Sequence, residues 1–344
     1  MKGRAAHVAV TLGLALIAQS AAGAQGPSPP MNYLEAFGGK AGSIATLTWA
    51  LLILSIAVVV IITALTLAAV LRRRSPRRAT EADREPLARE ESGLSWITIG
   101  VAISTVALLG GMAWNAYTMA AINRPPHDPA LTIRVIGHQW WWQFRYKSDD
   151  PSQIFDTANE AHIPVGQTVR FEVETADVIH SFWIPALGDK IDLIPGQTNE
   201  TWLEAGQPGV YRGQCSEYCG RQHAHMAITV VADAPKDFEA WRAAQLRPAK
   251  PQAGTLASAQ TLFVARCGAC HTVRGAGAGG ALGPDLTHLM SRRDIAANTL
   301  PNTIANLSGW IADPQTIKPG AKMPVLELSA PELATIRQYL ETLE

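Results

Sequence analysis

Two long uncharged stretches constrain this chain more than any other feature. Residues 41–71 and residues 92–123 contain no charged side chain. Each can form a helix of about 20 residues or more, long enough to span a bilayer, and we expect helices over about 45–71 and 94–121. The segment between them carries seven arginines, five of them within residues 72–78. By the positive-inside rule this segment is cytoplasmic, so everything after about residue 124 lies outside the cytoplasm. A buried helical pair in a soluble protein is the alternative, and two such long uncharged runs argue against it.

The N-terminal segment, residues 1–24, predicts export. Lys2 and Arg4 precede an apolar run over residues 8–18, and small residues end the segment at Ala24. This is the pattern of a secretory signal peptide cleaved after Ala24. An uncleaved anchor is the alternative, but the run is short for a bilayer span. The formal net charge of zero gives no reason to expect a nucleic-acid partner.

The part that follows the second uncharged stretch divides into two domains of different kind. Short segments that alternate apolar and polar side chains, separated by Pro-Gly turn signals, fill much of residues 126–245. They predict a compact β-sandwich or barrel of about 100 residues. Residues 246–254 form an extended, proline-containing linker. Residues 255–344 begin and end with helical patterns around a glycine-rich middle, which predicts a small all-α domain.

A cluster of soft ligands lies near the end of the strand-rich part, in the segment CSEYCGRQHAHM. It offers the thiols of Cys215 and Cys219, the imidazole of His223 and the thioether of Met226. Thiolate and thioether ligands favour copper over hard cations, and a methionine argues against structural zinc. His180, in DVIHSFWIP, can add a second imidazole, and two thiolates can bridge two copper ions. A disulfide or a zinc site is the alternative for the cysteines, and a structural role is the alternative for His180.

These two segments resemble the dinuclear copper (CuA) motif of cytochrome c oxidase subunit II, Cys-Ser-Glu-x-Cys-Gly-x-x-His-x-x-Met. The resemblance extends over the signal peptide, the two membrane helices and the β-domain, to about residue 245. It implies a two-helix transmembrane hairpin followed by a cupredoxin-like Greek-key β-sandwich or barrel. In the family the two cysteines bridge the coppers, each histidine binds one of them, and the remaining two ligands are weak. The copper ligands implied for this chain are His180, Cys215, the carbonyl of Glu217, Cys219, His223 and Met226.

The resemblance implies further roles around this centre. The aromatic stretch GHQWWWQFRY lies over the copper site in the family, and Trp140 matches the position that receives the incoming electron. A structural role is an equal alternative for Trp141 and Trp142. The Glu217 carboxylate would also reach a magnesium ion at the border with subunit I, and His225 is not a ligand.

One position departs from the family pattern. Many relatives carry a glutamate three residues before a tryptophan at the start of the second membrane helix, at the mouth of a proton path. Here Gly93 stands at that spacing before Trp96. We therefore assign no residue of this chain to proton uptake.

The last domain carries the signature CxxCH of covalent c-type haem attachment, at residues 267–271. The thiols of Cys267 and Cys270 bind the haem vinyl groups, and His271 supplies the proximal nitrogen. A redox-active or zinc-binding pair of cysteines is the alternative, and an exported domain of about 90 residues with terminal helices argues against it.

A methionine is the expected sixth ligand of the haem iron, because Met/His ligation raises the reduction potential. Met323 is preferred, since it precedes the final helix and its Met-Pro pair resembles class I cytochromes c; Met290 and His288 are weaker candidates. By the same resemblance, the carbonyl of Pro284 accepts a hydrogen bond from the haem-bound histidine. Trp310 would be buried against a haem propionate, with core packing as its alternative.

The whole chain therefore resembles the subunit II of a caa-type haem-copper oxidase, in which the CuA domain is fused to a cytochrome c. The resemblance implies an oxidoreductase subunit that accepts electrons at haem c and passes them to CuA. From there they reach haem a in subunit I, where oxygen is reduced to water with proton translocation. The expected partners are subunits I and III and a donor such as another cytochrome c or the bc complex. The expected location is the bacterial inner membrane, crossed twice, with both soluble domains on the periplasmic side.

Four other functions share part of these features. A copper-dependent nitric oxide reductase shares the copper domain and differs in its catalytic subunit. A membrane-anchored copper-handling protein, without electron transfer, would need neither the CxxCH domain nor a matched ligand set. A nitrous oxide reductase is disfavoured because the sequence has two membrane helices and no propeller, and a quinol oxidase subunit would lack the cysteine pair.

Overall fold

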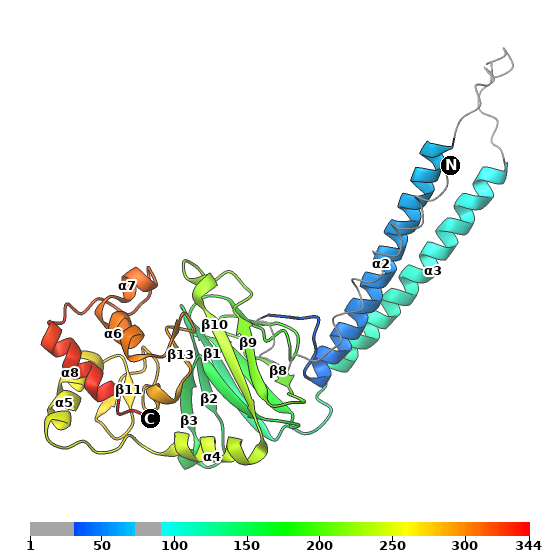
Figure 1. Cartoon of the computed structure of the whole chain (residues 1–344). Helices are drawn as coiled ribbons and strands as arrows, with labels where there is room; N and C mark the ends of the chain where they lie inside the picture. Colours follow the sequence, from blue (N-terminus) through cyan, green and yellow to red (C-terminus); the bar gives the residue numbers. More distant parts are fainter. Residues whose placement is uncertain (1–30, 73–90) are drawn as a thin grey trace, which may run out of the picture.

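The computed structural model describes residues 31–72 and 91–344 and divides them into three parts. A pair of long helices projects from a central β-domain, and a mainly helical C-terminal domain packs on the opposite side of that β-domain (Figure 1). The predicted signal peptide and most of the arginine-rich segment lie outside the described residues.

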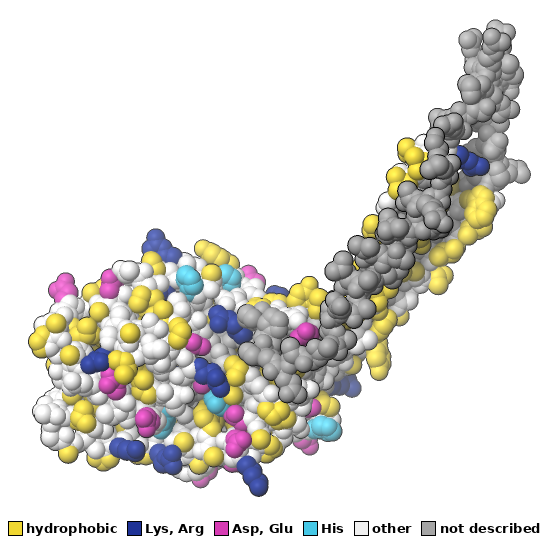
Figure 2. All heavy atoms as spheres, in the orientation of Figure 1, with side chains coloured by type: hydrophobic (Ala, Val, Ile, Leu, Met, Phe, Trp, Pro, Cys, Tyr) yellow, Lys and Arg dark blue, Asp and Glu magenta, His cyan; other side chains and the backbone are white. Residues whose placement is uncertain are grey.

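The helical pair consists of α2 (Gly39–Leu71) and α3 (Glu91–Ile122). Both are long and apolar enough to cross a membrane: their most apolar 18-residue windows have mean hydropathies of 2.9 in α2 and 1.8 within Ser95–Ile122, and these windows contain no buried residue. Exposed hydrophobic side chains run along the helices, whereas charges are scattered over the rest of the surface (Figure 2). Helix α2 begins six residues before the predicted start near residue 45. The reason is that its first turn, around Lys40, packs on the β-domain.

The β-domain is a sandwich of two main sheets, as the cupredoxin-like prediction required. The larger sheet has the order β3-β2-β1-β5-β8, and the smaller one has the order β4-β10-β9. Strand β1 is parallel to β5 and β10 is parallel to β4, whereas the other neighbours are antiparallel. Every second side chain of β1 is buried, and these residues face the core between the sheets. The strands are β1 (Leu131–His138), β2 (Trp141–Tyr146), β3 (Phe155–Ala158), β4 (Glu160–Pro164), β5 (Val169–Thr175), β6 (His180–Phe182), β7 (Ile191–Leu193), β8 (Asn199–Leu203), β9 (Gly209–Gln214) and β10 (Ala227–Asp233).

The C-terminal domain is mainly helical, as predicted. Helix α5 packs against α8, where the rings of Phe263 and Tyr339 lie 5.2 Å apart, and a capping box of Ser329 and Glu332 begins α8. Helix α4 (Pro235–Leu246) closes the β-domain and leads into the connection. The elements of the C-terminal domain are α5 (Thr255–Cys267), β11 (Thr272–Val273), β12 (Ala278–Gly279), β13 (Asp294–Ile295), β14 (Leu300–Pro301), α6 (Ile304–Ala312), α7 (Pro314–Ile317) and α8 (Ala330–Leu340).

Buried polar contacts join the helical pair to strand β8. The Lys40 ammonium is 3% exposed and lies 2.5 Å from Asp189 and 2.6 Å from the hydroxyl of Thr201. The indole N–H of Trp202, the next residue of β8, donates to the carbonyl of Ile122 at the end of α3, at 2.8 Å. Because both helix ends are bonded to one strand, the β-domain is held in a fixed orientation relative to the two helices.

This attachment predicts the effect of removing Asp189. The change Asp189→Ala leaves the buried Lys40 ammonium without its counter-charge and should lower the free energy of unfolding by about 2 to 3 kcal/mol. Asp192→Ala is the matched control, because Asp192 pairs with Lys190 at 3.5 Å on the surface and such pairs contribute about 1 kcal/mol or less. Thermal unfolding of the full chain in detergent measures both, and equal melting temperatures for the two variants would contradict the prediction.

Candidate copper and haem sites

The soft-ligand cluster lies in the loop that connects β9 to β10. Cys215 follows the last residue of β9, Met226 precedes the first residue of β10, and His180 begins the short strand β6. The β9–β10 pairing closes the loop, because the Cys215 N–H donates to the Met226 carbonyl at 3.1 Å. Four side chains of the cluster are each at most 2% exposed: His180, Cys215, Cys219 and Met226. Strand pairing therefore holds one imidazole, two thiols and one thioether in the core of the β-domain.

Five of the six predicted copper ligands lie in this loop, and the sixth, His180, is brought next to them by β6. The sulfurs of Cys215 and Cys219 are 3.8 Å apart, and both thiols are free. His180 Nδ1 lies 3.9 Å from the Cys215 sulfur, and His223 Nδ1 lies 3.5 Å from the Cys219 sulfur. The Glu217 carbonyl oxygen is 3.3 Å from Cys215, and the Met226 sulfur is 3.8 Å from Cys219. Each sulfur therefore has one imidazole and one weaker donor beside it.

The donor chemistry of the cluster fits a soft metal. Among the described residues, the ligand atoms of His180, Cys215 and Cys219 all lie within 4.8 Å of one another. The contact between the two sulfurs lowers the pKa of Cys215 and raises the pKa of Cys219. The pair thus shares one readily lost proton, and metal binding would displace the other.

Asp177 orients the His180 ring and was not recognised from the sequence. Its carboxylate accepts from His180 Nε2 at 2.8 Å, so Nδ1 is the ring nitrogen that faces the Cys215 sulfur. Burial alone would raise the pKa of Asp177. Hydrogen bonds from His180 and from the backbone N–H groups of Gln139 and Val178 outweigh this effect and hold the pKa well below its usual value. The carboxylate is therefore ionised, and it fixes the imidazole tautomer as an outer partner does at a metal centre.

Two other predicted positions in the loop are placed apart from the cluster. His225 is exposed, and its Nδ1 pairs with the side chain of Gln222 at 2.7 Å, which agrees with its expected exclusion from the ligand set. The Glu217 side chain is half-buried at the protein surface. Its predicted contact with magnesium stays a prediction.

A cavity of about 540 Å³ occupies the C-terminal domain where it meets the β-domain. Cys267, at the end of α5, lines this cavity together with Cys270 and His271. His271 Nδ1 donates to the Pro284 carbonyl at 2.9 Å, the hydrogen bond that the resemblance predicts. Burial lowers the pKa of His271, so the ring is neutral and the lone pair of Nε2 is free to bind a metal.

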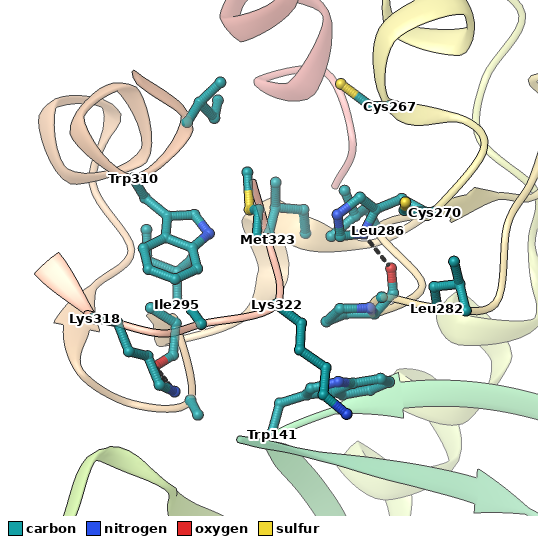
Figure 3. Close-up of a pocket in the computed structure, with 18 of the residues that line it drawn as sticks. Trp141, Cys267, Cys270, Leu282, Leu286, Ile295, Trp310, Lys318, Lys322 and Met323 are labelled. Carbon is teal, nitrogen blue, oxygen red and sulfur yellow. Dashed lines mark hydrogen bonds between the residues drawn. The ribbon is translucent and has the colours of Figure 1, made fainter. Parts of the chain in front are cut away.

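The cavity separates the candidates for the opposite axial ligand. Met323 is among the lining residues, whereas Met290 and His288 are not. His288 is turned to the connection and the C-terminus instead, since its ring nitrogens pair with the carbonyls of Arg247 and Glu344 at 3.0 and 2.8 Å. In Figure 3, Cys270 lies at the right of the pocket and Met323 lies across from it, on the side of Trp310, while Trp141 from a β-domain strand lies at the bottom.

Two further side chains indicate that the cavity is suited to an anionic, mainly apolar group. Trp310 lines the cavity, as does Arg292, whose Nε is buried without a hydrogen-bond partner. A buried guanidinium next to a cavity is costly unless an anion compensates it, and a haem propionate is such an anion. Sequence reasoning missed Arg292, because the pattern LMSRRD gives no sign of which arginine turns inward.

The aromatic segment, residues 137–146, which includes β2, joins the two sites. Trp140 lines the cavity, and its indole N–H donates to the carbonyl of Cys219 at 2.9 Å. Gln139 donates to the same carbonyl at 2.8 Å. Trp141 also lines the cavity, and its ring stacks on His138 with centroids 4.3 Å apart. Trp142 is fully buried in the β-domain core. The three tryptophans therefore have three different environments.

Comparison with known proteins assigns both domains. Residues 131–233 match the family model "Cytochrome C oxidase subunit II, periplasmic domain", and residues 256–344 match "Cytochrome c". The chain is 40% identical over 220 residues to cytochrome c oxidase subunit 2 of Alkalihalophilus pseudofirmus, which covers 63% of this chain and 62% of that protein. It is 42% identical over 132 residues to a probable cytochrome c oxidase subunit 2 of Rickettsia bellii, covering 33% of this chain and 49% of that protein. The chain thus spans about half to three fifths of the length of these relatives.

A solved structure is also similar to the β-domain. The periplasmic domain of subunit II of cytochrome oxidase from Bradyrhizobium japonicum is 37% identical, with a TM-score of 0.33, and the match covers 35% of this chain and 95% of that one.

The fold and the two sites define a membrane-anchored protein that combines a cupredoxin-like domain with a cytochrome c domain. By these matches, residues 131–233 are similar to the periplasmic domain of cytochrome c oxidase subunit II and residues 256–344 to cytochrome c, and the chain as a whole is similar to curated cytochrome c oxidase subunit 2 proteins. These two assignments imply copper in the β-domain and haem c in the C-terminal domain.

The packing around His271 predicts a specific sensitivity to one methyl group. A Cβ on Gly283 would lie 2.6 Å from His271 Cε1 and 2.9 Å from Nδ1, so Gly283→Ala must displace the ring from the Pro284 carbonyl. We expect the fraction of chains that carry covalent haem to fall severalfold, because overpacking of this size costs about 1 to 3 kcal/mol.

The matched control is Gly279→Ala, where a Cβ meets nothing within 4 Å. Haem content per chain, measured by the absorbance of the pyridine complex, distinguishes the two variants. Full haem content in Gly283→Ala would show that His271 is not held in the described position.

Proposed function

We propose that this chain is the electron-transfer subunit II of a caa-type cytochrome c oxidase. It accepts electrons from an external donor at haem c and passes them to a dinuclear copper centre. The electrons then continue to haem a in subunit I, where oxygen is reduced to water. When bound, the haem and the copper pair each take up and release one electron at a time, and the residues of this chain fix where this occurs.

In this proposal the two centres have separate ligand sets within one chain. Haem c would be held by Cys267, Cys270, His271 and Met323. Two thiolates, two imidazoles and two weaker donors would hold the copper pair. The proposed copper ligands are His180, Cys215, the carbonyl of Glu217, Cys219, His223 and Met226, and the Glu217 carboxylate adds a magnesium contact shared with subunit I.

One observation carries the proposal. Trp140 lines the cavity of the C-terminal domain and is hydrogen-bonded through its indole to the carbonyl of Cys219. A single side chain therefore contacts the walls of both candidate sites, which supports Trp140 as the residue where the electron enters the copper centre. A copper-handling protein without electron transfer has no use for such a contact.

The membrane arrangement and the partners form part of the same proposal. We place helices α2 and α3 in the bacterial inner membrane, with both soluble domains on the periplasmic side. The proposed domain boundaries are those predicted from the sequence, at residues 1–24, 25–125, 126–245, 246–254 and 255–344. Subunits I and III are the proposed membrane partners, and a cytochrome c or the bc complex is the proposed donor.

The first test determines whether the cluster holds a copper pair. Metal analysis of the full chain should find two coppers and one haem, and electron paramagnetic resonance should show one unpaired electron shared between two coppers. Cys219→Ser should abolish the shared signal, because only one bridging thiolate remains. Ser216→Ala, next to Cys215 in the same loop, should keep the shared signal. One copper per chain with an ordinary single-copper spectrum would overturn the proposed function.

The second test concerns Trp140. Trp140→Phe removes the hydrogen bond to Cys219 and should slow electron arrival at the copper at least about tenfold after flash reduction of the haem, since small displacements of positioned groups can cost about two orders of magnitude in rate. Trp241→Phe, on helix α4, is the matched control and should transfer at the normal rate. Equal rates in both variants, with unchanged copper spectra, would show that the electron does not pass by Trp140.

A further inference from the structure

The C-terminal domain is bonded to the β-domain through the hairpin of β13 and β14. The side-chain amide of Asn298 donates to the hydroxyl of Thr229 on β10 at 2.6 Å. The N–H of Ala227 donates to the Ala297 carbonyl at 3.3 Å, and the N–H of Arg293 donates to the carboxylate of Glu160 at 3.2 Å. Asn298 is 8% exposed and Thr229 is 4% exposed, so their contact is shielded from water.

The backbone of this hairpin is unusual at the point of contact. Three successive residues without a glycine, Ala296, Ala297 and Asn298, have φ angles of 53°, 57° and 58°. For residues with a Cβ this left-handed conformation costs roughly 1 kcal/mol or more each. Such a conformation persists where the surroundings over-determine it, and here two of the three residues make hydrogen bonds to the β-domain. We call residues 296–298 the docking loop.

Lys318 joins the docking loop to the aromatic segment of the β-domain. Its side chain is 3% exposed. The ammonium donates to the carbonyl of Trp140 at 2.7 Å and to the carbonyl of Ala296 at 3.2 Å. Next to it, the side chain of Gln222 donates to the Pro319 carbonyl at 2.7 Å. Burial lowers the pKa of Lys318 to about 7. In either protonation state, a buried amine bonded to one carbonyl from each domain requires a defined geometry, because displacement leaves its N–H groups without acceptors and away from water.

The connection between the domains is itself bonded to the C-terminal domain. The N–H of Ala249 donates to the Arg274 carbonyl at 2.9 Å, and the side chain of Arg274 donates to the Gln245 carbonyl at 2.5 Å. His288 pairs with the Arg247 carbonyl at 3.0 Å. The first half of residues 246–254 therefore follows the surface of the C-terminal domain and is not a free spacer.

We infer that the docking loop and Lys318 form an intramolecular docking surface, which holds the cytochrome c domain in one fixed position on its own copper domain. The same contacts hold the cavity of the cytochrome c domain against Trp140 and Trp141. Electron transfer within the chain then takes place from this fixed arrangement, without a search by a tethered domain. The electron-transfer part rests on the proposed function, whereas the docking does not depend on bound metal.

The bond between Asn298 and Thr229 provides the test. Thr229→Val keeps the size of the side chain but leaves the buried Asn298 amide without its acceptor, and Asn298→Ala removes the donor. An unmade buried hydrogen bond costs about 1 to 3 kcal/mol, which corresponds to about fivefold to 150-fold in an opening equilibrium. Amide hydrogen exchange of peptides 294–301 and 138–142 in the full chain should accelerate by this factor in either variant. The double variant should add little more, because both changes remove one contact.

Thr168→Val is the matched control. Thr168 is equally buried, and its hydroxyl donates to Glu204 within the β-domain at 2.9 Å. We expect exchange of the same two peptides to stay within about twofold of the wild type in this control. Unchanged exchange in Thr229→Val, or the same change in both threonine variants, overturns the docking surface. Fully additive effects of Thr229→Val and Asn298→Ala also overturn it.

Flash reduction of haem c in the same variants tests the link to electron transfer. Loss of protection together with a severalfold slower arrival of the electron at copper supports the fixed arrangement. Loss of protection with an unchanged transfer rate overturns it, because transfer would then not need the docked state. If no electron reaches copper in the wild-type chain, the proposed function fails, and the exchange data still decide whether the docking surface exists.

Discussion

The carbonyl of Cys219 is the point on which the two sites of this molecule depend. It accepts hydrogen bonds from the side chains of Gln139 and Trp140 at 2.8 and 2.9 Å, so the loop after β9 is fixed to the segment before β2. Gly220 makes this approach possible, because its φ is 112° and a Cβ there would lie 3.0 Å from the Trp140 ring. The tryptophan can therefore cover the sulfur cluster and still form part of the wall of the neighbouring cavity.

Each part of the chain is attached to the next by buried polar groups. Lys40 and Trp202 fix the two helices to β8, and Lys318 fixes the C-terminal domain to the aromatic segment. Buried polar contacts of this kind add little net stability, but they tolerate only one geometry. The distance between the helices, the sulfur cluster and the second cavity is thus set by hydrogen bonding, with apolar packing supplying the bulk of the stability of each domain.

The sequence was informative where the chemistry is local and uninformative where it depends on distant contacts. The spacing of Cys215, Cys219, His223 and Met226 in one loop suffices to predict that they meet, and CxxCH predicts the second site by itself. His180 lies far from the loop in sequence and was only one available imidazole among others, so its ligand role came from the resemblance to subunit II, as did the role of the Pro284 carbonyl. Two contacts, those of Asp177 and Lys318, could not be predicted, because nothing local distinguishes an aspartate or lysine that turns inward. The linker also has a composition typical of a spacer, yet its partners lie in the adjacent domain.

Asp177 links the two domains through its carboxylate. One oxygen of its carboxylate accepts from His180, and the other is 3.0 Å from Lys322, the neighbour of Met323 in the other domain. A substitution of Lys322, in the loop that carries Met323, therefore changes the charge next to the carboxylate that bonds His180. Exchange of the C-terminal domain for a homologous one without a basic residue at position 322 would remove this ion pair, while the hydrogen bonds of Asp177 with His180, Gln139 and Val178 within the β-domain would remain.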